Sequence, residues 1–380
     1  MNLVANQALE GGVRPPIPPS TPWIGDILPA VAWALEPEIP WAAPKAAETY
    51  QLERAKQVVL ILVDGLGTGP LAERLGYAAT LRTIGSRPVV GQTCAPSTTA
   101  AAITSFATGQ TPGRTNMVGY SVRFDDVVMN LLNFKPGLVP ERWQNHPTFF
   151  ERLAEVGVIA DLFTAPKFEN SGLTRAALRG ARFWGRQTLQ ERFSQALTAL
   201  RAGAELAFVY WADLDKVGHK SGPKSDRWAE ALEAFDSELG KFLARLPRDV
   251  TVLLTADHGM VQVDRRVDIA RRPDLSEGVE MIAGEGRAVH VHAFPSERGR
   301  VVSRWLDHFG DQAWMFTRTQ MRDVIGAGPG VDLMGDLLVM PKGSYVIVDS
   351  RTQPAAAIAM EGVHGSLTEE EMAIPIWRLA

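Results

Sequence analysis

Three short apolar runs in this chain each stop at or just before an aspartate, and this pattern limits the fold more than any other feature. The runs cover residues 58–63, 206–211 and 250–255, and the acids that follow are Asp64, the pair Asp213 and Asp215, and Asp257. Runs of this length, rich in β-branched and aromatic residues, are typical of strands buried on both faces of a parallel sheet. Functional groups gather at the carboxyl ends of such strands, so we expect these acids to share one crevice.

The rest of the chain alternates in the same manner. Further strands are expected near 158–163, 288–293 and 336–348, and helices near 70–82, 186–202, 224–246 and 297–309. This alternation predicts an α/β fold, a three-layer α/β/α sandwich with a mostly parallel central sheet. The turn-rich regions 110–145 and 265–287 interrupt the alternation and are expected to be loops or a small cap beside the active face.

Residues 1–56 carry nine prolines between Pro15 and Pro44, which favours an extended arm packed on the domain surface over packed helices. The catalytic domain is therefore expected to cover residues 57–380. The beginning of the chain lacks the charged start and apolar stretch of a secretory signal, so we expect a cytoplasmic protein. Its single cysteine, Cys94, rules out an internal disulfide and is compatible with that compartment.

The overall charge limits the partners. The 380-residue chain has a formal net charge of -4 and a pI near 6.0, so it has no overall basic character. A nucleic-acid polymer or an acidic membrane surface is therefore not expected as the main partner. A small-molecule substrate is expected instead, bound by a monomer or dimer.

The acids at the strand ends come with histidines. Asp257 is followed directly by His258, and Asp215 precedes His219 by four residues, which places both on one side if the segment forms a helical turn. Taken singly, an aspartate after a strand is more often a helix cap or a turn former. Carboxylates and imidazoles together are ligands for divalent metals, so the combined pattern favours a metal site. His290 and His292 also share a strand face, where ordinary polar positions are the simpler interpretation.

A cluster of hydroxyl groups is a second feature that could take part in the chemistry. Ser97, Thr98 and Thr99 follow Pro96 and precede an alanine run of high helix propensity. A hydroxyl in the first turn of a helix lies near the positive end of the helix dipole and near free N–H groups, which favours both an alkoxide and a bound phosphate. Simple N-capping explains one such hydroxyl without requiring three.

Five ordered motifs resemble the alkaline phosphatase superfamily, and most closely its type I phosphodiesterase and nucleotide pyrophosphatase branch. The matching pieces span roughly residues 58–366: Val63-Asp64-Gly65-Leu66, Pro96-Ser97-Thr98-Thr99 leading to Thr108-Gly109, Asp215-Lys216-Val217-Gly218-His219 with Gly222-Pro223, Thr255-Ala256-Asp257-His258-Gly259-Met260, and Val363-His364-Gly365.

The resemblance implies two divalent metal ions, zinc or alternatively manganese, on an α/β/α sandwich. It assigns Asp215, His219 and His364 to one metal, and assigns Asp64, Asp257, His258 and the nucleophile to the other. The family nucleophile lies nine residues before the threonine of the Thr-Gly pair, which gives Thr99 here, with Thr98 as its rival.

The resemblance also bears on the substrate. The family's phosphate-binding asparagine falls at Tyr120, which departs from the pattern, and the nearby Asn116 is an alternative for that role. Lys167 is a further candidate for substrate binding. A sulfatase is disfavoured because its motif requires an arginine at the position of Thr98.

These features predict a metal-dependent phosphodiesterase or nucleotide pyrophosphatase that acts through a phospho-threonine intermediate. The alternatives are a phosphomonoesterase of the same superfamily, and a relative that binds phosphate or nucleotide without turnover. A phosphomutase is a further alternative, but the sequence shows no second basic cluster for a phosphate.

Overall fold

A seven-stranded sheet forms the centre of the structure, a computed structural model that describes residues 21–380. Its strand order is β2 (Val89–Gln92), β17 (Ala373–Arg378), β8 (Val250–Thr255), β1 (Gln57–Val63), β7 (Leu206–Trp211), β5 (Ala160–Thr164) and β6 (Arg182–Gly185). The strands from β8 to β6 run parallel, whereas β17 runs antiparallel to both of its neighbours. The expected mostly parallel sheet is confirmed.

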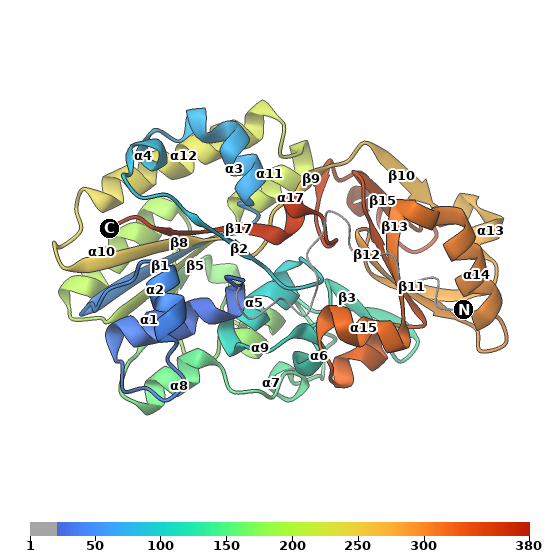
Figure 1. The fold of residues 1–380 in the computed structure, drawn as a ribbon, viewed down its shortest axis with the longest axis horizontal. Helices are drawn as coiled ribbons and strands as arrows, with labels where there is room; N and C mark the ends of the chain where they lie inside the picture. Colours follow the sequence, from blue (N-terminus) through green and yellow to red (C-terminus); the bar gives the residue numbers. More distant parts are fainter. Residues whose placement is uncertain (1–20) are drawn as a thin grey trace.

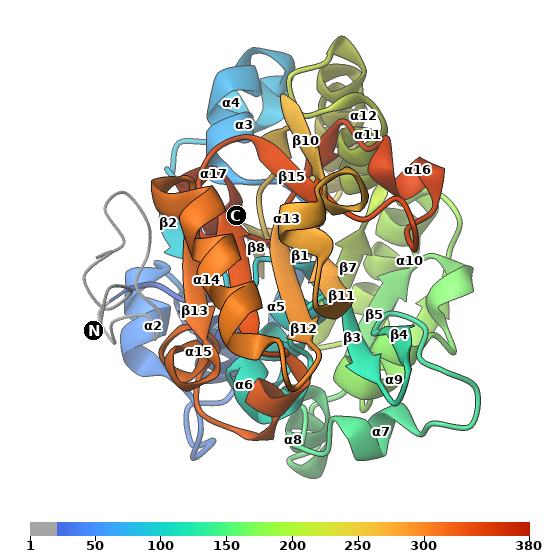
Figure 2. The ribbon, with the colours of Figure 1, turned by 90° about the vertical axis from the view of Figure 1, so that its right-hand side faces the viewer.

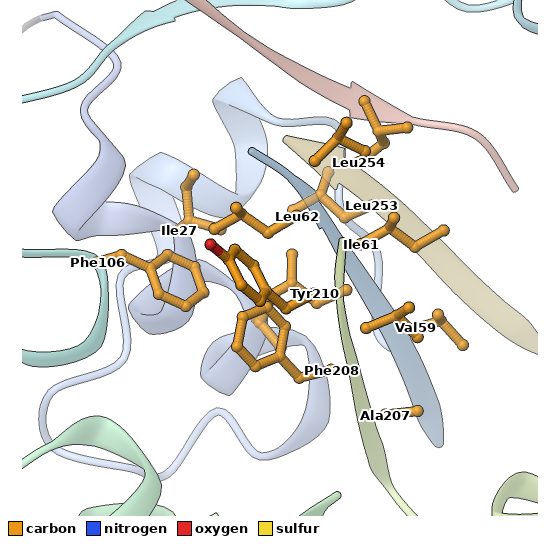
Figure 3. Packing of buried hydrophobic residues seen from close by; sticks show 14 of the residues in the cluster. Ile27, Val59, Ile61, Leu62, Phe106, Ala207, Phe208, Tyr210, Leu253 and Leu254 are labelled. Carbon is orange, nitrogen blue, oxygen red and sulfur yellow. The ribbon is translucent and has the colours of Figure 1, made fainter. Parts of the chain in front are cut away.

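The three apolar runs form the adjacent strands β8, β1 and β7 in the middle of this sheet. Every residue of β7 and β8 is buried, as are all residues of β1 after Gln57. In the main hydrophobic core, the ring of Phe208 packs against that of Phe106, and Leu62 belongs to the same cluster (Figure 3). Burial on both faces explains why these runs are apolar throughout instead of alternating.

Helices cover both faces of the sheet (Figure 1). One group, on the upper side of Figure 1, contains α3 (Thr68–Arg74), α4 (Ala79–Thr83), α11 (Asp213–Ser221) and α12 (Asp226–Leu243), and α10 (Leu189–Arg201) packs against α12. The other group contains α1 (Ile27–Leu35), α2 (Pro44–Thr49), α5 (Thr99–Thr108), α8 (Phe149–Glu155) and α9 (Gly172–Ala177). The chain thus has the three layers that its sequence predicts.

The extended arm expected near the N-terminus is wrong for residues 24–49. Helices α1 and α2 occupy this region, and seven of the nine residues of α1 are buried against the core. Pro29 lies in the first turn of α1, where a proline is tolerated because no helical N–H is lost there. Residues 1–20 of the predicted arm lie outside the described residues.

A second lobe stands beside the main sheet, on the right of Figure 1. Its four-stranded antiparallel sheet has the order β11 (Val279–Glu285), β12 (Ala288–Ala293), β14 (Leu337–Pro341) and β13 (Ala313–Thr317), and it carries α14 (Arg298–Phe309) and α15 (Arg318–Ile325). The runs at 288–293 and 336–348 therefore do not join the parallel sheet. The two-residue connection between β11 and β12 imposes an antiparallel hairpin, which apolar patterning by itself does not indicate.

The two regions expected as loops or a cap contain regular structure. Residues 110–145 hold α6 (Pro112–Thr115), the hairpin of β3 (Ser121–Phe124) and β4 (Val127–Asn130), and α7 (Pro140–Trp143), and β3 contacts β11. Residues 265–287 hold β10 (Arg265–Asp268), η4 (Ile269–Arg271), α13 (Pro273–Ser276) and β11. The cap is thus larger than the sequence suggested, because these segments are built into the second lobe.

Short elements connect the two lobes. β9 (Val261–Gln262) pairs with β16 (Gly362–Val363), and β10 pairs with β15 (Tyr345–Val348). The remaining elements are η1 (Ile24–Asp26), η2 (Leu75–Tyr77), η3 (Pro166–Phe168), η5 (Gly310–Gln312), η6 (Pro329–Leu333), α16 (Ala355–Ile358) and α17 (Glu369–Met372). Among residues 21–380, no helix combines the length and the apolar character needed to cross a membrane.

Candidate active site

The carboxyl ends of the three central strands bring the predicted acids together. Asp64 follows β1 directly, Asp257 lies two residues beyond β8, and Asp215 lies in the first turn of α11 after β7. Since β8, β1 and β7 are neighbours, their ends meet at one edge of the sheet. The shared crevice that the sequence predicts is present in the structure.

The first cluster contains Asp215, His219 and His364. Asp215 and His219 lie one turn apart on α11, as their spacing predicted, and Oδ2 of Asp215 is 3.3 Å from Nε2 of His219. His364 follows β16, and its Nε2 lies 3.7 Å from Oδ1 of the same aspartate. One ligand atom from each of these three residues lies within 4.8 Å of the others, which is compact enough to hold a metal ion.

The second cluster surrounds the imidazole of His258. Its Nε2 lies 3.4 Å from Oδ1 of Asp64, 3.4 Å from Oδ2 of Asp257 and 3.1 Å from the hydroxyl of Thr99. Asp215 also lies within metal-sharing distance of Asp64 and His258, so it stands between the two clusters. The rings of His258 and His364 are stacked with centroids 3.6 Å apart, which places the clusters side by side.

Backbone contacts set the protonation of the three imidazoles. Nδ1 of His219 lies 2.8 Å from the carbonyl of Gly362, Nδ1 of His258 lies 3.0 Å from that of Gly259, and Nδ1 of His364 lies 2.8 Å from that of Ser97. A carbonyl only accepts, so each Nδ1 carries the hydrogen and donates it. Each Nε2 is left with a free lone pair directed toward the aspartates, as metal ligation requires.

One oxygen of each of the three carboxylates has no hydrogen-bond partner among the described residues and is available to a cation. Oδ1 of Asp64, Oδ1 of Asp215 and Oδ2 of Asp257 are all buried without a hydrogen-bond donor in the described part of the chain. Burial, and then the charges of the neighbouring acids, raise the pKa of Asp64 well above its ordinary value, and burial likewise raises the pKa of Asp257. Buried, mutually repelling carboxylates are costly unless a positive charge neutralises them, so the donor set suits divalent cations.

The three consecutive hydroxyls have different surroundings. Ser97 donates to the carbonyl of Ser366 and accepts from the N–H of Gly365, so its hydroxyl is fully occupied. Thr98 is the N-cap of α5, and Thr99 is its first residue. The Thr99 hydroxyl donates to Nε2 of His258, because that nitrogen carries no hydrogen. Thr99 is therefore the hydroxyl that faces the metal-ligand clusters at the positive end of a helix.

A cavity of about 360 Å³ opens beside Thr99, Asp64 and Asp215. Its remaining lining consists of Ile103, Leu132, Asn133, Thr164, Lys167, Phe168, Ser171, Leu173, Thr174, Leu178, Tyr210, Ala212 and Lys216. Lys167, a candidate for substrate binding, lies in this lining, and its role stays a prediction. Its ammonium lies 4.9 Å from the centroid of the Phe168 ring.

The other two predicted substrate residues do not line this cavity. Asn116 adopts a positive φ of 63°, and its amide donates to the carbonyl of Trp143, which ties it to α7. The Tyr120 side chain is 46% exposed, and its backbone N–H donates to Glu285. Their roles in substrate binding stay predictions. Arg175, a second basic residue of the segment that carries Lys167, donates two hydrogen bonds to Glu141 and does not line the cavity.

Several residues of the site have no recognisable signal in the sequence. The hydroxyl of Tyr210, at the end of β7, donates to Oδ2 of Asp64, and Asn133 lines the cavity from the turn after β4. Tyr210 lies within an apolar run, so the sequence pattern predicts a core residue there. For Asn133 the pattern predicts an ordinary loop residue. Both reach the site only because distant segments fold against one another.

The family assignment agrees with this geometry. Residues 58–367 match the sequence profile of the type I phosphodiesterase / nucleotide pyrophosphatase family, so the chain belongs to that family. Phosphopentomutase of Clostridium botulinum is 33% identical over 105 residues, which are 27% of this chain and 23% of that protein. Phosphopentomutase of Rhizobium johnstonii is 31% identical over 172 residues, 42% of this chain and 38% of that protein. The matches thus span well under half the length of these curated relatives.

Solved structures share the fold. Murine ectonucleotide pyrophosphatase / phosphodiesterase 5 superposes with a TM-score of 0.67 at 14% identity, over 84% of this chain and 87% of that one. Phosphonoacetate hydrolase of Sinorhizobium meliloti 1021, in complex with phosphonoformate, superposes with a TM-score of 0.66 at 16% identity, over 85% and 90%. The predicted type I phosphodiesterase / nucleotide pyrophosphatase branch of the alkaline phosphatase superfamily is confirmed by the family match. The family indicates an enzyme that transfers or hydrolyses phosphoryl groups.

Proposed function

We propose that this protein hydrolyses phosphodiesters or nucleotide pyrophosphate bonds at a site holding two divalent metal ions, most suitably zinc, with manganese as the alternative. The single observation that carries the proposal is the position of the Thr99 hydroxyl, 3.1 Å from Nε2 of His258 and at the first residue of α5. A nucleophilic hydroxyl beside carboxylate and imidazole ligands is the arrangement that metal-assisted phosphoryl transfer needs.

The bound metals would supply Lewis acidity, lowering the pKa of a coordinated hydroxyl and neutralising charge on the phosphoryl oxygens. Asp215, His219 and His364 would hold one ion, and Asp64, Asp257, His258 and Thr99 the other. Oγ1 of Thr99 gives up its proton to water and forms a bond to phosphorus, while the ester bond breaks and the leaving group departs with the bonding electron pair. Water then releases the phosphoryl group from the resulting phospho-threonine, and Thr99 regains its hydroxyl.

The cavity favours a diester or pyrophosphate over a monoester. Its apolar wall, including Leu132, Phe168 and Leu173, offers a surface to a second ester group, which a monoester lacks. Lys167 and Asn133 also line this cavity, and we propose that they contact polar atoms of the substrate. We place the reaction in the cytoplasm, where the single, buried Cys94 stays reduced.

Two substrates with the same leaving group test the preference. We expect a higher kcat/KM for bis(p-nitrophenyl) phosphate than for p-nitrophenyl phosphate, and a clear preference for the monoester would contradict the proposal. Thr99→Ala should abolish turnover of both, whereas Ser97→Ala, which removes a structural hydroxyl, should retain it if the protein folds. Unchanged hydrolysis by Thr99→Ala would exclude this nucleophile.

The local similarity to phosphopentomutases supports a second candidate, the net movement of a phosphate group between positions of a phosphorylated pentose. Incubation with ribose 1-phosphate separates the two candidates by product. A mutase would form ribose 5-phosphate without releasing phosphate, whereas a hydrolase would release phosphate or remain inactive on this monoester.

A further inference from the structure

A second hollow lies in the other lobe. It has a volume of about 550 Å³ and lies among β10, η4, η5 and the C-terminal end of α14. Figure 2 shows β10, α13 and α14 on one face of the molecule. The lining of this hollow consists of Arg265, Arg266, Val267, Asp268, Arg271, Arg272, His308, Phe309, Gln312, Val348 and Ile358. None of these residues lines the cavity beside Thr99, so this arginine hollow is a separate feature.

The charge of the arginine hollow is opposite to that of the whole chain. Four arginines line it, against Asp268 as the one acid of its lining, in a protein with a formal net charge of -4. Two consecutive arginine pairs, at 265–266 and 271–272, supply this charge. The sequence does not indicate this basic cluster, because the pairs belong to β10 and to the end of η4 and only the folded chain shows that both line one hollow.

Internal contacts hold these guanidinium groups in place without using all their donors. Arg272 makes a two-pronged contact with Asp274, and Arg266 donates to the carbonyls of Ile358 and Met360. Arg265 donates to Gln312 and lies over the ring of Tyr345. A guanidinium has five N–H donors, so each arginine keeps some for a ligand. Guanidinium groups fixed in this manner suit phosphate and carboxylate groups.

Two solvent-accessible ion pairs at the rim can be replaced by contacts to an incoming anion. The side chain of Arg271 is 85% exposed and reaches Asp268 at 3.4 Å, and the guanidinium of Arg266 reaches Glu361 at 3.2 Å. Such pairs contribute little to stability because water competes with them. A ligand bearing several negative charges can therefore engage the same arginines at little cost to the fold.

His308 adds a neutral donor. Its Nδ1 lies 2.9 Å from a guanidinium nitrogen of Arg272, which can only donate, so Nδ1 accepts and Nε2 carries the hydrogen of the neutral ring. Burial, and then the charge of Arg272, lower the pKa of His308, which keeps the ring neutral. The remaining lining of Val267, Phe309, Val348 and Ile358 provides an apolar surface beside the charged groups.

We propose that the arginine hollow is a second ligand site, which binds a small molecule carrying two or more phosphate-like anionic groups on an apolar or compact body. The four arginines would hold the anionic groups, and the apolar lining would contact the body. The site is distinct from the metal-ligand clusters, so it would function whether or not the reaction proposed above is correct.

Pyrene trisulfonate dye (pyranine) is a suitable probe, because it is fluorescent, carries three sulfonates on an aromatic body and contains no phosphate to hydrolyse. Its fluorescence anisotropy would be titrated with the full chain, with Arg265→Gln/Arg271→Gln, and with a control variant, Arg201→Gln/Arg248→Gln. The control removes the same two charges at exposed positions of the main lobe. Arg271→Gln alone, at a side chain that is 85% exposed, gives a variant whose folding is not in question.

Arg265→Gln/Arg271→Gln should bind the dye at least about tenfold more weakly than the unsubstituted protein. The Kd of the control variant for the dye should stay within about twofold of that of the unsubstituted protein. Hydrogen exchange should slow in residues 265–272 and 308–312 on binding, and inorganic tripolyphosphate should displace the dye. Equal weakening in both double variants, or protection confined to the segment around Thr99, would overturn the proposal. Displacement by heparin but not by tripolyphosphate would also overturn it and indicate a macromolecular surface instead.

Discussion

The guanidinium of Arg287, in the turn directly before β12, donates to both carboxylate oxygens of Glu371 at 3.0 and 2.5 Å, and both side chains are fully buried. Glu371 also accepts from the N–H of Ser366, two residues after His364, and its carbonyl accepts from the N–H of Gly259, next to His258. This ion pair thus joins the second lobe to the segments that carry two metal-ligand candidates.

Removing one partner of this pair should be strongly destabilising. Arg287→Met leaves a buried carboxylate uncompensated, which costs about 3–5 kcal/mol. We expect a clearly lower melting temperature by differential scanning calorimetry, together with a loss of activity because His364 and His258 lose their support. The exposed pair of Arg300 and Glu297 provides the control, and Arg300→Met should leave both properties nearly unchanged. A melting temperature for Arg287→Met equal to that of the control would contradict the assigned role.

Removing divalent metals should destabilise the protein. The unpartnered oxygens of Asp64, Asp215 and Asp257 repel one another when no cation lies between them. We expect chelation to lower the melting temperature, and zinc in excess over its Kd to restore it by roughly 3–4 kcal/mol of added stability. His219→Ala should weaken this restoration, and a melting temperature insensitive to chelator and metal would argue against metal sites.

Tyr210 should act as a positioning residue for Asp64, because its hydroxyl donates to Oδ2 of that carboxylate. Tyr210→Phe removes this donor and keeps the ring. We expect metal affinity, measured by titration into chelator-treated protein, to fall by roughly 10–100-fold. Tyr345→Phe is the matched control, since its hydroxyl donates to the carbonyl of Gln312 in the other lobe. Unaltered affinity in Tyr210→Phe would show that Asp64 is held by other contacts.

Lys167 should contribute to substrate binding. Its ammonium lies on the cavity wall, and burial and the charge of Lys216 both lower its pKa. Lys167→Met should raise KM for an anionic diester by about tenfold with little change in kcat, since a ground-state contact is removed. Lys241→Met, at an exposed lysine paired with Glu238, should leave KM unchanged. Equal KM values for the two variants would place Lys167 outside the binding determinants.

Glu285 should make stability depend on pH. Burial raises the pKa of this carboxyl to about 8, against the opposing effects of Thr98 and the N–H of Tyr120. Because the folded pKa exceeds the ordinary value of 4.5, the stabilisation by Glu285 is complete below pH 4.5. It is lost as pH rises toward 8, by at most about 1.4 kcal/mol per pH unit.

Glu285→Gln cannot titrate, so its stability relative to the unsubstituted protein should increase between pH 5 and pH 8. Melting temperatures of both proteins across this range give the difference directly. Glu280→Gln is a control at an exposed carboxylate of the same strand. A constant difference between the unsubstituted protein and Glu285→Gln would show that Glu285 ionises normally.

The sequence by itself determined the four adjacent parallel strands β8, β1, β7 and β5 of the central sheet and most of the candidate metal ligands. Buried parallel strands must be apolar throughout, and a carboxylate at the end of such a run must lie at the edge of the sheet. The residues next to Asp64, Asp215 and Asp257 are therefore enough to predict where these acids lie. The spacing of Asp215 and His219 likewise predicts one helical turn, and both residues lie on α11.

The tertiary structure decided which distant segments complete the site. Nothing in the local pattern distinguishes Tyr210 from its buried neighbours, and the apolar run at 288–293 fits a parallel or an antiparallel strand equally well. Pairing, hairpin connections and lobe packing select among these choices, because they depend on contacts between residues far apart in the chain. Such contacts between distant residues also decide the surroundings of Thr99 and the positions of Asn116 and Tyr120. They form the arginine hollow as well.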